Sequence, residues 1–212
     1  MLFSQTPAGW SCETPAVGSE GVVRCAAEEM LPGTETLSIV VFVAQPHGTT
    51  LSNLARVVSA ALDATPTDNT IIESTNVLVP VAINIRPGGH PNPVNLHSNV
   101  TVAILTTSAG EYGLPLAFNA TTINPLSVRF GPASVLLGGA GGAPEIHLTG
   151  HIEDSYELDE NTKDGDLDML FHFNAAAAGL TLGTTNACVR GTFTMGGTIF
   201  SFFGCDSIKI VP

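Results

Sequence analysis

The stretch EIHLTGHIEDSYELDENTKDGDLDMLFHF, Glu145–Phe173, decides the fold expected for the second half of this chain. Its two ends, EIHLTGHIE and DLDMLFHF, alternate apolar and polar residues, which is the pattern of half-buried β-strands. Eight carboxylates lie from Glu153 to Asp168, and five of them fall in the segment between these ends. We therefore expect an antiparallel hairpin whose two strands are joined by an acidic loop.

Pairing Glu153 with Asp166 keeps the apolar residues of both strands on one side of this hairpin. The apolar contacts expected on the core side are Ile152–Leu167, Leu148–Phe171 and Ile146–Phe173. In the same register His151 faces Asp168 and His147 faces His172. The opposite face then collects histidines and carboxylates.

The residues His147, His151, Asp168 and His172 on this face form a candidate site for zinc or another transition metal. Cross-strand neighbours lie about 5 Å apart at Cβ, and imidazole and carboxylate are the usual ligands of hydrolytic zinc. If such a metal activated a water molecule, Glu153 or Asp166 would be the general base. The alternative is a solvated sheet face with hydrogen bonds between histidine and aspartate.

The loop sequence DENTKDGDLD resembles a calcium loop, in which alternating oxygen ligands surround a glycine at a sharp turn. It is not an EF-hand, because Phe171 occupies the position of the closing glutamate. The expected calcium ligands are Asp154, Asp159, Asn161, Asp164, Asp166 and Asp168. A solvated acidic loop without a metal is the alternative.

The composition supports a β-rich chain with an acidic surface. Only 12% of the 212 residues are charged, whereas 44% are hydrophobic, and Gly and Pro number 22 and 14. The formal charge of −12 argues against a nucleic-acid partner, because phosphate binding needs a basic face. It favours divalent cations as partners. No apolar run reaches the roughly 18 residues of a membrane span.

The four cysteines fall into two local pairs, Cys12 with Cys25 and Cys188 with Cys205. Neither pair has the spacing of a zinc site, and each can close a short loop across adjacent strands. Such disulfides indicate an oxidising compartment. Four free thiols are the alternative.

The N-terminal residues PAGWSCETPAVGSEGVVRCAAEEMLPGTETLSIVVFV, followed by GTTLSNLARVVSA and PTDNT, resemble the conserved repeat domain of bacterial surface proteins. The resemblance covers roughly residues 5–79 and implies an immunoglobulin-like sandwich that serves as a spacer or adhesin stalk. The leading strands of that family are mostly missing before Gly9. We therefore expect an incomplete sandwich with an open edge, through which a homodimer could form.

The residues from Val81 onward resemble an uncharacterised domain of secreted bacterial proteins. The matching pieces include INIRPGGHPNPVNL, INPLSVRFGP, DGDLDMLFHF and GCDSIKIVP, although YELDENTK interrupts the family's acidic run. The fold expected is all-β, with two β-sandwich domains at 1–79 and 80–212. Pro80 marks the expected boundary.

These observations predict an extracellular or cell-surface module of a bacterial protein, stabilised by calcium and serving a structural or adhesive role. The chain begins without a leader peptide, so we expect an exported form to have lost it or to be a fragment. The alternative function is a metal-dependent hydrolase of ester or phosphoester substrates. Its basis is the predicted group of His147, His151, His172 and Asp168.

Overall fold

The structure is a computed structural model that describes residues 3–5, 7–41, 43, 45–138 and 141–211. Strands dominate, and α1 (Ala133–Leu137) is the one α-helix among the described residues. The prediction of an all-β fold is therefore confirmed. The chain divides into two compact units, Met1–Gln45 and Pro46–Pro212.

The first unit consists of two antiparallel strand pairs. β1 (Phe3–Gln5) pairs with β4 (Ser38–Val40), and β2 (Trp10–Glu13) pairs with β3 (Arg24–Ala27). Cys12 and Cys25 are directly opposed on β2 and β3 and form the predicted disulfide.

The second unit begins with a hairpin of β5 (Thr50–Arg56) and β6 (Thr70–Asn76), joined by a loop that contains the 3-10 turn η1 (Pro66–Asp68). No described side chain in 7–78 is buried. The strands of this part of the chain are therefore paired without a buried core, and the incomplete N-terminal sandwich stays a prediction. The domain boundary at residue 80 stays a prediction, but every buried residue of the described chain lies at or beyond Val79.

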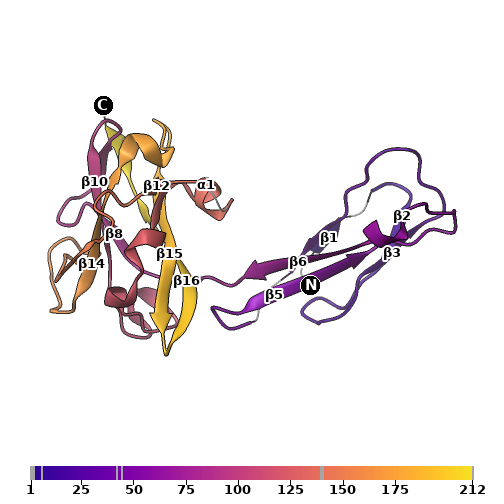
Figure 1. The fold of residues 1–212 in the computed structure, drawn as a ribbon, viewed down its shortest axis with the longest axis horizontal. Coiled ribbons are helices and arrows are strands. Elements are labelled where there is room, and N and C mark those ends of the chain that lie inside the picture. The colour runs from indigo at the N-terminus through magenta and orange to yellow at the C-terminus, as the bar shows by residue number, and fades with distance from the viewer. Residues whose placement is uncertain (1–2, 6, 42, 44, 139–140, 212) are drawn as a thin grey trace. The chain divides into compact units, whose positions relative to one another are not determined.

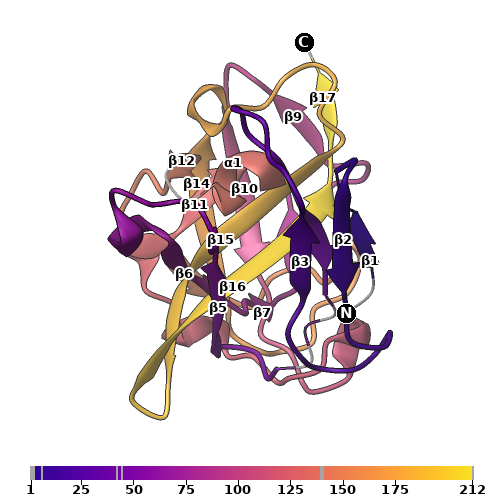
Figure 2. The ribbon, with the colours of Figure 1, turned by 90° about the vertical axis from the view of Figure 1, so that its right-hand side faces the viewer.

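The remaining strands form a β-sandwich (Figures 1 and 2). One sheet has the order β13-β14-β10-β8, the other β12-β11-β15-β16-β7, and β9 and β17 form a separate parallel pair. The strand bounds are β7 Val79–Pro80, β8 Ile83–Ile85, β9 Pro93–Asn95, β10 Asn99–Ile104, β11 Arg129–Gly131, β12 Ala143–Pro144, β13 His151–Glu153, β14 Asp168–Asn174, β15 Asn186–Met195, β16 Thr198–Ser207 and β17 Lys209–Val211. Four 3-10 turns connect them: η2 Glu111–Gly113, η3 Ala120–Thr122, η4 Pro125–Ser127 and η5 Ala175–Ala178.

Phenylalanines from both sheets fill the core. Four of them are fully buried: Phe171 and Phe173 on β14, Phe130 on β11 and Phe202 on β16. Phe130 stacks on Phe173 with ring centroids 5.1 Å apart. Because strand side chains alternate between faces, this packing turns Asp168, Leu170 and His172 to the outer face of the β13-β14-β10-β8 sheet. Leu170 packs there in a small second cluster with Ala82, Ala103 and Leu105.

The β15–β16 hairpin turns at Gly196 and Gly197. Both glycines have positive φ, 58° and 82°, which is the conformation that a tight two-residue hairpin loop requires. Cys188 and Cys205 are directly opposed on these strands and form the second predicted disulfide. A loop of this size contributes on the order of 3 kcal/mol to stability in the chain-entropy model.

Candidate metal centre

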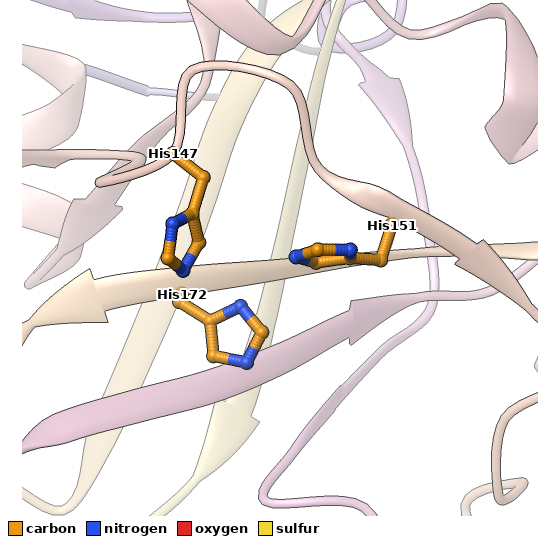
Figure 3. A group of neighbouring side chains, drawn as sticks. All are labelled: His147, His151 and His172. Atoms are coloured by element: carbon orange, nitrogen blue, oxygen red, sulfur yellow. The ribbon is translucent and has the colours of Figure 1, made fainter.

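Three histidines converge at the edge of the four-stranded sheet, and we call them the histidine centre. His172 lies on β14, His151 opens β13, and His147 lies in the segment before β13. Their ring centroids are 5.3 Å (His147–His172), 5.4 Å (His151–His172) and 5.6 Å (His147–His151) apart. Figure 3 shows each ring turning a nitrogen toward the space between the three, and one such nitrogen from each lies within 4.8 Å of the others.

A bulge in the edge strand produces this convergence. Glu145 bridges to Phe173, whereas His151 pairs with Leu170. Between these two pairings the edge segment advances six residues, whereas β14 advances three. Bulges of this kind re-aim side chains at sheet edges and beside active sites. Here the extra residues return His147 to the same neighbour, His172, that His151 contacts.

The backbone of the bulge is strained. Leu148 has φ of 64°, in the left-handed region that β-carbon sterics disfavour. Gly150 has φ of 66°, and a Cβ added there would lie 2.8 Å from the Phe171 ring and 3.3 Å from the Leu170 carbonyl oxygen. Only glycine fits this position without displacing a core ring. Strain held at one place by the surrounding fold is characteristic of functional sites.

His172 is the most enclosed of the three histidines. Its Nδ1 is buried and makes no hydrogen bond to the described protein, and this is the nitrogen that faces the other two rings in Figure 3. Burial lowers the pKa of His172, and the charges of His147 and His151 lower it further, against the opposing effect of Glu145 and Glu153. The ring is therefore neutral at physiological pH, which is the form that binds metals.

A buried carboxylate adjoins His172 from the core side of the bulge. Glu145 is 1% exposed, and its Oε1 accepts a 3.4 Å hydrogen bond from the His172 backbone N–H. Its Oε2 is buried without a hydrogen-bond partner in the described protein. A buried polar atom without a partner is costly, and a cation nearby would provide one for this oxygen. No pattern in the sequence singles out Glu145 as part of this site.

The predicted hairpin register is wrong by two residues. Glu153 pairs with Asp168, and His151 pairs with Leu170. Asp168 is 1% exposed, and its carboxylate accepts hydrogen bonds from the backbone N–H groups of Thr106 and Ser155 at 2.8 and 2.9 Å. These bonds fix Asp168 as the start of β14 and separate it from the histidines. Three of the four residues of the predicted transition-metal site therefore come together, and Asp168 does not.

The predicted core contacts of the edge strand are also wrong. Ile146, Leu148, Ile152 and Leu167 are all exposed, between 40% and 57%. Phe171 and Phe173 instead pack with the rest of the sandwich core. The reason is that β13 is only three residues long and lies at the sheet edge, so the bulge replaces the continuous strand on which the prediction depended.

Two carboxylates of the acidic loop, residues 154–167, accept hydrogen bonds from other residues of the same loop. Asp159 accepts hydrogen bonds from the Asn161 and Thr162 backbones and from the Thr162 hydroxyl, and these bonds lower its pKa. Asp164 accepts from the Asp166 backbone. Lys163 donates to the Asp154 carbonyl at 2.7 Å, while the buried Asp154 Oδ1 has no partner among the described residues.

The structure gathers a different set of carboxylates from the one predicted for calcium. Glu111, Glu157 and Asp164 each bring one oxygen to within 4.8 Å of the others, and we call them the acidic cluster. Glu157 is buried, accepts a 2.6 Å hydrogen bond from the Tyr112 hydroxyl, and has a raised pKa because of that burial. Of the six predicted ligands only Asp164 belongs to this cluster. Glu111 lies too far away in sequence for a loop motif to include it.

The other three histidines lie outside this site. His90 and His97 are exposed. His47 is partly buried, and its Nδ1 lies 3.0 Å from the Leu78 carbonyl oxygen.

Comparison of the chain with family models, with curated proteins and with solved structures finds no match. No helix in the described part of the chain is both long and apolar enough to cross a membrane.

Proposed function

We propose that the chain is a structural module of an extracellular bacterial protein and that its sandwich holds a transition-metal ion, zinc being the best fit, at the histidine centre. The observation that carries the proposal is the convergence of three imidazoles on one space, one of them through a buried nitrogen without a partner. Three histidines with an open fourth position are a known zinc ligand set. The two disulfides support an oxidising, extracellular setting.

Zinc requires only a small rearrangement of these rings. Zinc–nitrogen bonds of about 2.0–2.1 Å in tetrahedral geometry place the nitrogens about 3.3 Å apart. His147 and His151 are exposed, so both side chains are free to move toward the more enclosed His172. Binding of the metal would tie the bulge to β14 and so stabilise the sheet edge.

Calorimetric titration with zinc, after metal removal by chelation, tests this proposal. We expect one zinc ion per chain and at least tenfold weaker binding by His151→Ala. His97→Ala is the matched control, because His97 is equally exposed and lies outside the centre; it should bind zinc as the parent does. An absence of zinc uptake, or equal loss in both variants, would contradict the proposal.

Calcium is proposed as a second ion of the same module, in the acidic loop. What supports it is the acidic cluster together with the buried, unpartnered Asp154 Oδ1, because carboxylate oxygens are the ligands that calcium prefers. Asp164→Asn should weaken calcium binding and leave zinc binding unchanged. Zinc and calcium titrations of this one variant separate the two sites.

Hydrolysis is the second candidate function, and the position of Glu153 favours it. Glu153 lies two residues along β13 from His151, so the alternation of a strand places both side chains on the same face of the sheet. Such a carboxylate is a suitable general base, whereas Asp166 lies in the acidic loop. Zinc-loaded protein should hydrolyse p-nitrophenyl acetate or phosphate, and Glu153→Gln should reduce the rate at least tenfold while retaining zinc. Rates equal to free zinc would exclude this function.

A further inference from the structure

A pocket of about 390 Å³ lies on the outer face of the four-stranded sheet, next to the histidine centre. Its lining includes Thr101, Glu153 and Leu170. Thr101 is the cross-strand partner of His172, and Leu170 is that of His151. Directly paired residues have Cβ atoms about 5 Å apart, so the pocket adjoins the histidine centre, although none of the three histidines is among its lining residues.

The charge of this pocket is opposite to that of the molecule. The chain has 7 basic and 19 acidic residues, yet the pocket is lined by two basic residues, Arg86 and Lys163, and one acidic residue, Glu153. Arg129 and Arg190, by comparison, direct their guanidinium groups to backbone carbonyls. The Arg86 side chain is exposed and makes no hydrogen bond or ion pair with another described residue.

The backbone holds Arg86 at the rim. Its N–H donates to the Thr101 carbonyl at 2.8 Å, and its φ of 60° turns the chain out of β8. The turn that follows packs against Tyr156, since a Cβ on Gly88 would lie 3.2 Å from the Tyr156 ring. The Nζ atom of Lys163 lies 5.0 Å from the centroid of the same Tyr156 ring. The Tyr156 ring therefore adjoins both the turn that carries Arg86 and the Lys163 ammonium.

We propose that this pocket binds a small organic oxyanion, a carboxylate or a phosphate monoester, with one oxygen on the metal and another on Arg86. A guanidinium recognises such groups with two parallel hydrogen bonds, and the metal supplies a second positive charge. The pocket volume exceeds that of the anionic group alone, so the organic part would lie against Tyr156 and Leu170. This inference rests on the proposed zinc site.

Calorimetric titration of zinc-loaded protein with phenylphosphonate and with benzoate tests the inference, after elemental analysis has confirmed the zinc content. At least one of the two probes should bind, and comparison of their affinities identifies phosphate or carboxylate as the preferred group. Arg86→Gln should weaken that binding at least tenfold without changing the zinc content. Arg24→Gln, at an exposed arginine in the first unit, is the matched control and should bind as the parent does.

The outcomes separate the two proposals. This inference is overturned if zinc-loaded protein binds neither probe, or if the Arg86→Gln variant binds them as the parent does. Either outcome leaves the metal site intact. Protein that takes up no zinc contradicts the proposed function and this inference together.

Discussion

The histidine centre and the acidic loop are both dense groups of ionisable side chains, and they differ in what their polar atoms already contact. In the loop, Asp159 and Asp164 accept backbone hydrogen bonds from their own turns, and the buried atoms without a partner, Asp154 Oδ1 and Ser155 Oγ, lie outside the acidic cluster. In the histidine centre, His172 Nδ1 and the adjacent Glu145 Oε2 are buried without a partner. The difference teaches that charge density alone does not define a metal site. A metal site is defined instead by converging ligand atoms that have no hydrogen-bond partner in the fold.

Removing the imidazole ring of His172 should have the largest effect on zinc affinity. His172→Ala should reduce zinc affinity at least a hundredfold, because the buried ligand is lost and only two exposed rings remain. Asp164→Asn, in the acidic loop, should change zinc affinity less than twofold. Competition with a chromophoric chelator measures both values. Similar losses in the two variants would show that zinc binds to the carboxylates instead.

The bulge that assembles the histidine centre can be tested without touching a ligand. Gly150→Ala places a Cβ against the Phe171 ring at positive φ, at a cost on the order of 1–3 kcal/mol. We expect a lower melting temperature and at least tenfold weaker zinc binding, because the bulge can no longer return His147 to His172. Gly183→Ala, where nothing lies within 4 Å of the added Cβ, should alter neither property.

Sequence alternation predicted the faces of β14 and the grouping of the histidines, because period two is fixed by strand geometry. It did not predict the hairpin register, because both registers keep the same faces and differ only in which carboxylate starts the strand. The hydrogen bonds of Asp168 to Thr106 and Ser155 decide that choice. One partner, Thr106, belongs to a distant segment.

The same limit explains what sequence reasoning missed. Local pairing of cysteines predicted both disulfides, since each pair closes within one hairpin. The acidic cluster joins Glu111 to Glu157 and Asp164 across a long sequence separation. The bulge at Leu148 and Gly150 interrupts a stretch whose alternation reads as one continuous strand. A local pattern contains no information on tertiary contacts of this kind.

The increase in melting temperature on metal binding should distinguish the histidine centre from the acidic loop. A ligand at a hundred times its Kd contributes about 2.7 kcal/mol, which corresponds to roughly 5–10 °C for a domain of this size. Zinc at that excess should raise the melting temperature of the parent and leave His151→Ala nearly unchanged. Calcium should produce a smaller increase that Asp164→Asn abolishes. Equal increases with both ions in the His151→Ala variant would indicate unspecific binding.

The smallest effect concerns the buried carboxylate of the acidic cluster. Burial raises the pKa of Glu157 above its ordinary value, so its contribution to stability is present at low pH and is lost as pH rises through the folded-state pKa. Without calcium, Glu157→Gln should therefore be as stable as the parent near pH 4 and slightly more stable at pH 7. Thermal melts over this range measure the difference. A variant that is less stable at pH 7 would show that the carboxylate is stabilised there.

The location of bound zinc in a crystal tests the central claim most directly. Diffraction data collected on both sides of the zinc absorption edge identify the ion by its anomalous signal, independently of any ligand assumed. We expect one strong peak enclosed by His147, His151 and His172. A principal peak on Glu111, Glu157 and Asp164, or no peak in crystals grown with zinc, would contradict it.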